Sequence, residues 1–335
     1  DCVSIVESMA RFATRDNEVI LRHLGRERLH PRLLELPGPR IASVCYSYGA
    51  LGWRHDTVFK EVMTAIIQEQ EKLQRARVLG LSAGAQEPLK FRASEVALVA
   101  MAMVRLRMYR GNNEWYRWGE NYEELLDILE KRLETPGELQ QMNARSLACA
   151  AFALGRARRG SEELCAALLG RMTQLLESGQ VSVGGSASEN WFREAPQEEL
   201  ERFMHGLAMM GPTKRKEFLD TQWLREWMCV NYYTLSLPDL IRVNRYLVQI
   251  RSFDQPYLET FVPLYCEPEN MSQLKKSDIM ELTHTYNGAK LKAEDMDEGQ
   301  HFFWALGKQY QSKHIAGLSE SLSVAKRRPA VERQG

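Results

Sequence analysis

The chain has 335 residues, 44% of them hydrophobic, and its 44 Lys and Arg residues balance its 44 Asp and Glu residues. This length is ample for a buried core and long for one compact globule. A free-standing nucleic-acid binder usually carries a basic excess, so the zero net charge argues against strong non-specific binding but leaves room for a local basic face.

The predicted elements, taken in chain order, are amphipathic helices with apolar residues at i, i+3, i+4 and i+7. A recurring segment begins at residue 41, with apolar residues at its first, fourth and eighth positions: Ile41, Val44 and Tyr48. The same spacing begins at residues 2, 96, 147, 200, 240 and 279, so successive starts are 39, 55, 51, 53, 40 and 39 residues apart. The fifth and seventh positions are mostly small, as in Ala151, Ala153 and Gly206, which would let a neighbouring helix approach closely.

A second apolar helix is predicted after most of these segments, at 57–67, 161–172, 216–228, 255–265 and 298–310. An acidic helix is predicted at 122–134. Gly, Ser and Pro mark insertions near 78–90, 110–121 and 179–194, which account for the longer registers. Because each such pair buries its apolar face only by stacking on a neighbour, the pattern predicts an all-α fold, an α-solenoid of about seven helical hairpins over residues 1–318. Residues 319–335 are predicted to be a flexible basic tail.

Basic residues gather where each first helix turns into the second. They are Arg11 and Arg15, then Arg54 and His55, then Arg105, Arg107 and Arg110, then Arg156, Arg158 and Arg159, then Lys214, Arg215 and Lys216, then Arg251, and last Lys290 and Lys292. In a stacked array equivalent positions line up along one edge, which would give a positive stripe suited to a phosphate backbone. The alternative is that each cluster only complements its helix dipole, an effect of roughly 0.3–1 kcal/mol.

Aromatic residues add a second candidate contact for RNA. Trp115, Tyr116 and Trp118 flank Arg117 in a polar insertion, and exposed aromatics beside Arg can stack on bases. They can equally anchor a protein interface or fold back onto the helices.

Signals for catalysis or metal binding are poor. The seven histidines show no HExxH or other ligand spacing, and neither a GxSxG nor a GxxxxGK[ST] motif occurs. The six cysteines form no CxxC pair, which favours buried free thiols over disulfides or a zinc site. No apolar run approaches the length of a membrane span. We therefore expect a non-enzymatic protein without catalytic residues, metal, cofactor, small-molecule substrate or membrane span.

The two-helix unit resembles the octotricopeptide and heptatricopeptide class of helical repeats found with RAP domains. The segment 144–172 carries the resemblance best, with an Ala- and Leu-rich first helix ending at Gly155, a short basic turn, and SEEL opening the second helix. Segment 238–265 repeats this outline less closely. The drifting registers also resemble divergent helical-repeat subunits of trypanosomatid mitochondrial RNA-editing complexes or mitoribosomes.

The resemblance implies an RNA-binding subunit of a ribonucleoprotein in the mitochondrial matrix, active in RNA editing, RNA processing or ribosome assembly. Its partners would be mitochondrial mRNA, guide RNA or rRNA together with other protein subunits. The alternative function is a protein–protein scaffold in a large organellar complex without direct RNA contact. Met and aromatic residues, which suit large protein interfaces, favour that alternative.

Overall fold

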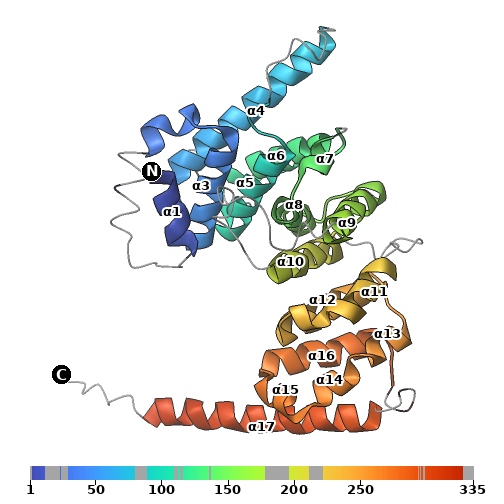
Figure 1. The fold of residues 1–335 in the computed structure, drawn as a ribbon. Coiled ribbons are helices and arrows are strands. Elements are labelled where there is room, and N and C mark those ends of the chain that lie inside the picture. The colour runs from blue at the N-terminus through green and yellow to red at the C-terminus, as the bar shows by residue number, and fades with distance from the viewer. Residues whose placement is uncertain are drawn as a thin grey trace, which may run out of the picture. The chain divides into compact units, whose positions relative to one another are not determined.

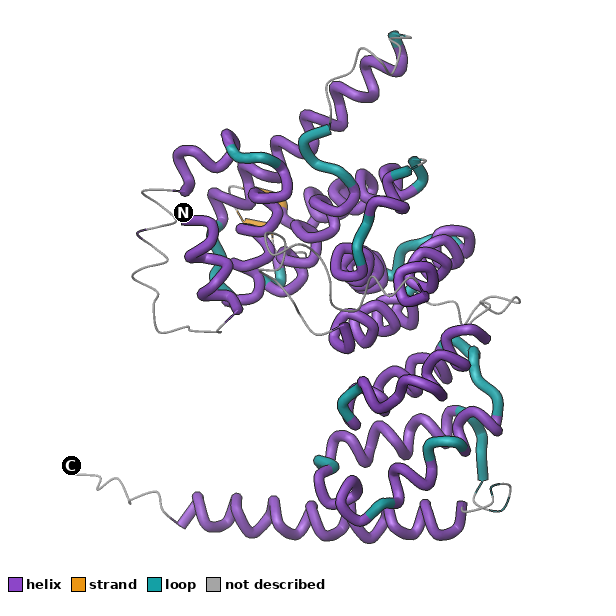
Figure 2. Tube along the Cα trace, viewed as in Figure 1, coloured by secondary structure: helices purple, strands orange, loops and turns teal. Residues whose placement is uncertain are grey.

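The structure is a computed structural model that describes residues 2–11, 23, 29–79, 89–108, 112–113, 116–135, 137–177, 196–210, 222–292, 294, 296 and 299–326. Apart from loops and turns, this part of the chain is helical except for a two-residue antiparallel pairing of β1 (Asn112–Asn113) with β2 (Tyr116–Arg117), so the all-α prediction is confirmed (Figure 2). None of the helices in these residues is both long and apolar enough to cross a membrane.

The chain divides into two compact units, Asp1–Lys214 and Arg215–Gly335, where the sequence predicted one array over 1–318. The last helix continues through Lys326, seven residues past Ser319, where the predicted tail begins. Residues 319–326 contain neither Gly nor Pro to end that helix, and the first Pro beyond it is Pro329.

The first unit is built from a row of packed first helices (Figure 1). In this row α1 packs on α3, α3 on α5, α5 on α8, and α8 on α10. The second helices α4, α6 and α9 pack against α3, α5 and α8 in that order, and α4 also contacts α6. The elements are α1 (Cys2–Arg11), η3 (His30–Glu35), α3 (Gly38–Leu51), α4 (Asp56–Val78), α5 (Ala93–Arg105), α6 (Trp118–Leu133), α7 (Glu138–Gln141), α8 (Ala144–Arg156), α9 (Glu162–Glu177) and α10 (Pro196–Met209).

Very close helix contacts hold this row together. A Cβ atom added to Gly206 would lie 2.3 Å from the backbone carbon of Ala151, and one added to Gly155 would lie 2.2 Å from the carbonyl oxygen of Gly206. A Cβ atom on Gly49 would meet the Cα of Ala102 at 2.7 Å. Of the residues in these contacts, Ala102, Ala151 and Gly206 lie at the fifth or seventh positions predicted to be small, whereas Gly49 and Gly155 lie at the ninth.

A buried ion pair anchors the chain where it enters α5. The carboxylate of Glu69 in α4 accepts hydrogen bonds from the backbone N–H groups of Lys90 and Phe91, at 2.6 and 3.2 Å. It also accepts one from Nη2 of Arg132 in α6, at 3.1 Å, and the Arg132 side chain is only 4% exposed. One carboxylate thus fixes three segments that are distant in sequence.

The second unit contains α11 (Gln222–Asn231), η8 (Tyr232–Thr234), α12 (Leu237–Gln249), α13 (Gln255–Glu259), α14 (Val262–Cys266), α15 (Pro268–Gln273), α16 (Lys276–Gly288) and α17 (Gly299–Lys326). Helix α12 packs on α16, and α17 packs on both α16 and α14 (Figure 1). The helix predicted at 255–265 is broken into α13 and α14. Pro263 lacks the N–H group that would bond to Glu259, which explains the break.

Buried tyrosines dominate the core of the second unit. The hydroxyl of Tyr257 donates to Oδ1 of Asn244 at 2.6 Å, and Nδ2 of Asn244 donates to the hydroxyl of Tyr265 at 3.0 Å. The hydroxyl of Tyr286 donates to the carbonyl of Leu258 at 2.8 Å. All three hydroxyls therefore have partners, as buried polar groups require.

Side chains cap the starts of three helices. Glu95 accepts a hydrogen bond from the backbone N–H of Arg92 before α5, and Asp278 accepts one from Lys275 before α16. The hydroxyl of Ser236 caps α12 by accepting from the N–H of Asp239. These contacts satisfy N–H groups that have no partner within the helix.

Candidate nucleic-acid interface

Five first helices end in the same backbone geometry. One or two residues past each helix the backbone is left-handed: Gly52, Arg107, Arg158, Arg251 and Lys290 have φ values of 68°, 56°, 57°, 57° and 59°. Each of these residues donates its N–H to the carbonyl three positions earlier, over 2.9 to 3.2 Å. In four of the five, the next N–H bonds to the carbonyl five positions before it, which completes a Schellman cap.

The spacing of these caps follows the registers of the sequence. The left-handed residues at 52, 107, 158, 251 and 290 are separated by 55, 51, 93 and 39 residues. The value 93 is the sum of the predicted 53 and 40, because the cap of the intervening segment falls outside the described residues. The caps thus place the predicted basic turns at structurally equivalent positions.

A cation at this position is energetically unexpected. A left-handed residue with a Cβ costs roughly 1–2 kcal/mol, which Gly avoids and which makes Gly the usual residue there. A cation near a helix C-terminus gains only about 0.3–1 kcal/mol from the dipole. Gly52 occupies the equivalent position after α3, so the geometry itself has no need of a charge. Helix-end electrostatics alone therefore do not account for Arg or Lys at the other four caps.

These four side chains are available to a ligand. Arg107, Arg158, Arg251 and Lys290 are all exposed. Within the described part of the chain, none of the four makes a side-chain hydrogen bond or ion pair. We call this set the cap cations.

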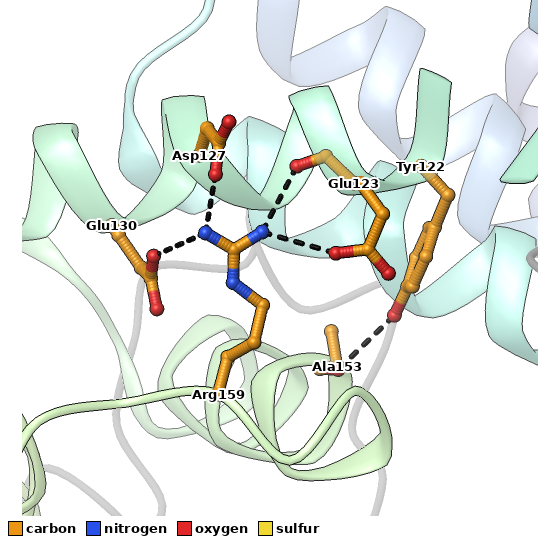
Figure 3. Close-up of polar contacts among 6 residues, drawn as sticks. All are labelled: Tyr122, Glu123, Asp127, Glu130, Ala153 and Arg159. Carbon is orange, nitrogen blue, oxygen red and sulfur yellow. Dashed lines mark hydrogen bonds and ion pairs between the residues drawn. The ribbon is translucent and has the colours of Figure 1, made fainter. Parts of the chain in front are cut away.

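Arg159, one residue beyond a cap cation, has a different role (Figure 3). Its guanidinium bonds to the carboxylates of Asp127, Glu130 and Glu123, the last two at 2.6 and 3.1 Å, and to the Glu123 carbonyl at 3.2 Å. Partial burial alone would lower the pKa of Arg159, but the hydrogen bonds to Asp127 and Glu130 outweigh it and raise that pKa. Arg159 therefore ties α8 to α6 and is surrounded by negative charge.

Other predicted residues at the turns have varied surroundings. Nε of Arg54 lies 2.6 Å from Oδ1 of Asp56, and Nζ of Lys292 lies 3.5 Å from Oε1 of Glu294. Arg156 is the exposed last residue of α8. Arg117 belongs to β2 and Trp118 begins α6. The remaining candidates, Arg110, Trp115, Lys214, Arg215 and Lys216, lie outside the described residues.

The predicted site residue Arg105 lies in a group with Arg145 and Arg202, which were not predicted because they lie within helices rather than at the turns. The guanidinium carbon of Arg105, at the end of α5, is 4.6 Å from the centre of the Tyr46 ring in α3. That of Arg145, at the start of α8, is 5.8 Å from the same centre. Nη1 of Arg202 in α10 is 3.5 Å from the Tyr46 hydroxyl. The register gives no common position for the three arginines: Arg105 lies nine residues after its segment start at 96, Arg202 lies two after 200, and Arg145 lies two before 147.

All six cysteines are free thiols, but only Cys45, Cys149 and Cys165 are buried as the sequence predicted. In the described ranges, no group of three or more His, Cys, Asp or Glu side chains is arranged to hold a metal ion. The protein-family models that were scanned include none that matches this chain, and a search of curated proteins finds no match either.

Proposed function

We propose that this protein is a non-catalytic, RNA-binding helical-repeat subunit of a mitochondrial ribonucleoprotein, with RNA phosphates held along the cap cations. The proposal includes the fold predicted from the sequence, an α-solenoid of about seven stacked helical hairpins. RNA editing, RNA processing and ribosome assembly are the activities that the repeat's resemblance favours, and the mitochondrial location rests on the same resemblance.

One observation carries the RNA proposal: four helix caps keep an exposed cation in a backbone conformation that favours Gly. Packed helices are about 8–10 Å apart. Within each unit, two cap cations therefore follow neighbouring packed helices: Arg107 and Arg158 follow α5 and α8, and Arg251 and Lys290 follow α12 and α16. Exposed cations that make no side-chain bonds to the described residues suit a flexible polyanion better than a small ligand.

The test replaces all four cap cations by Gly: Arg107→Gly, Arg158→Gly, Arg251→Gly and Lys290→Gly. Because Gly relieves the left-handed strain, we expect the melting temperature to stay the same or rise. We expect affinity for a single-stranded RNA to fall. The slope of log Kobs against log salt concentration should shrink by about 0.7 for each phosphate that the variant no longer binds.

A matched control removes the same number of exposed cations elsewhere, as Lys72→Gln, Arg75→Gln, Lys131→Gln and Lys308→Gln. The proposal requires the salt slope to change much more in the glycine variant than in this control. Equal salt slopes in the two variants would contradict the proposal. A glycine variant that is less stable but binds RNA normally would also contradict it, and would show that the cap cations only stabilise the helix ends.

A protein-only scaffold is the second candidate function, and exposed apolar side chains in the second unit favour it. Val230 is 69% exposed, Tyr233 73% and Trp304 61%. Large exposed apolar groups of this kind are common in protein interfaces. Crosslinking within the native complex separates the two candidates, since a scaffold would crosslink to neighbouring subunits through these residues and to no RNA.

A further inference from the structure

An exposed tryptophan lies on the side of α17 that faces away from the core of the second unit. Trp304 is 61% exposed, whereas Phe302 and Leu306, on the opposite side of the same helix, are buried. The exposed residues that share the side of Trp304 at helical spacing, and that we call with it the outer face of α17, are His301, Gly307, Lys308 and Gln311. Trp304 is thus a single large ring on a polar helix face, and the packing of α17 does not account for it.

The side chains beside this ring carry no negative charge. Nζ of Lys308 lies over the Trp304 ring, 4.9 Å from its centre, and the centre of the His301 ring is 6.2 Å away. Residues 299–313 include two Lys and one His but no Asp or Glu. A polyanion can therefore approach the outer face without meeting a carboxylate of this stretch of α17. An exposed ring beside a cation is also the combination that binds single-stranded nucleic acid.

Gly307 leaves the space on one flank of the ring open. Side chains three and four positions further along an α-helix lean back over a given residue. Lys308, at the fourth position, leans over Trp304 in this way, but Gly307, at the third, has no side chain. A Cβ atom added at Gly307 would meet nothing within 4 Å. Gly inside a helix is destabilising relative to Ala, and no close packing among the described residues requires it here.

We propose that Trp304, with the open space at Gly307 beside it, is a stacking platform for one unpaired base of a single-stranded RNA. The base lies on the part of the ring that Lys308 leaves uncovered. Every base can stack, so the platform selects unpaired RNA over duplex RNA without selecting a sequence. The outer face has no apolar side chain besides Trp304, which favours RNA over a protein partner, because the centre of a protein interface is apolar. This inference rests on the proposed function and adds to it a contact that is not an ion pair.

The test measures the affinity of the full chain for a labelled single-stranded oligoadenylate by fluorescence anisotropy. Trp304→Ala should weaken binding roughly tenfold, as expected for the loss of one stacked base, and Trp304→Phe should keep most of the affinity because it keeps a ring. The salt slope should be the same in Trp304→Ala and in wild type, since no phosphate contact is removed. Tyr233→Ala is the matched control, because it removes another exposed ring from the same unit and should leave the affinity unchanged.

Gly307→Gln tests the open flank without removing the ring. Gln has a higher helix propensity than Gly, and its Cβ atom would meet no neighbour, so the melting temperature should stay the same or rise. The added side chain would lean into the space beside Trp304, so binding of the oligoadenylate should weaken. This variant guards against a loss of binding that merely reflects misfolding. As a direct readout, the oligoadenylate should quench tryptophan fluorescence more in wild type than in Trp304→Phe.

The outcomes separate this inference from the proposed function. RNA binding that is lost in the cap-glycine variant and unchanged in Trp304→Ala overturns the platform alone, and the reverse result overturns only the role of the cap cations. A loss in Trp304→Ala that is as large for a duplex RNA as for the oligoadenylate also overturns the platform, since paired bases cannot stack on the ring. Wild-type protein that binds no RNA overturns both. Crosslinking of Trp304 to a protein subunit in the native complex, and to no RNA, would assign the outer face to a protein interface instead.

Discussion

The two units of this protein stabilise stacked helices in different ways. In the first unit, helices meet backbone to backbone through Gly155, Gly206 and Ala151, with little side-chain volume between them. In the second unit, large rings fill the space, and Asn244 connects the hydroxyls of Tyr257 and Tyr265. Close backbone packing tolerates no added atom, whereas a hydrogen-bonded aromatic core tolerates no added charge. The two units should therefore fail under different perturbations.

Alkaline pH should have the largest effect, and it should act most steeply on the second unit. Burial raises the pKa values of Tyr257, Tyr265 and Tyr286, so the folded state keeps protons that the unfolded chain releases. The stability that these groups contribute is fully present below the unfolded pKa of about 10 and is lost as pH rises toward the folded pKa values. Between the two, the free energy of unfolding should fall by about 4 kcal/mol per pH unit for the three tyrosines together.

The first unit should respond to alkali earlier and less steeply. Burial raises the pKa of the Cys45 thiol from 9.0 to about 12, so its contribution begins to fall near pH 9. Tyr48, whose pKa is also raised by burial, adds to the loss of stability above pH 10. Urea midpoints measured against pH, in single-tryptophan variants that keep Trp53 or Trp227, would report each unit. Full tyrosinate absorbance near pH 10 in a folded protein would contradict these raised pKa values.

Gly206→Ala should have the next largest effect, confined to the first unit. The new methyl group would meet the backbone of Ala151, which cannot rotate away as a side chain could. We expect the free energy of unfolding to fall by at least about 3 kcal/mol, at the upper end of overpacking effects. Gly170→Ala is the matched control, because its Cβ would meet nothing within 4 Å and should stabilise α9 by up to about 1 kcal/mol. Equal stability of the Gly206 variant and wild type would show that α8 and α10 can move apart.

Arg159→Gln should have the smallest effect. The variant leaves three carboxylates near one another, but all of the ion pairs that it removes are partly exposed. We expect the free energy of unfolding to fall by less than about 1 kcal/mol, and the difference should shrink further as salt is added. Chemical denaturation at low and high salt measures it, with Arg75→Gln as the control for an ordinary pair on one helix. A large effect that does not depend on salt would mean that Arg159 acts through packing.

The sequence predicted the parts of the fold that depend on local pattern. The apolar spacing located the first helices, and the small residues at the fifth and seventh positions located one side of each close contact, with Gly49 and Gly155 on the other side in two of them. Such features could be predicted because residues at helical spacing share a face whatever the helix later packs against. Pro263 lies within the apolar run at 255–265, whose spacing predicts a single helix, so the apolar pattern did not indicate the break that the proline causes.

The candidate site depends on contacts that no local pattern reveals. Arg159 and Arg158 are neighbours in sequence, yet one is held by three carboxylates of α6 and the other is exposed. The left-handed backbone of Arg158 is what directs the next side chain, Arg159, toward α6. In the same way, Arg202 reaches Tyr46 only because four first helices pack in a row.

Because of the Glu69 carboxylate, the packing of α5 does not depend on the length of the loop that precedes it. This carboxylate holds the backbone at Lys90 and Phe91 from the side of α4, so the position where α5 begins is set by an anchor rather than by the number of residues that precede it. This gives a physical reason why registers as different as 39 and 55 residues can coexist in one chain. We expect the segment between Leu79 and Leu89 to accept an inserted peptide tag or fluorescent label while the hairpin stays folded, which makes it a practical handle for purifying and tracking the protein.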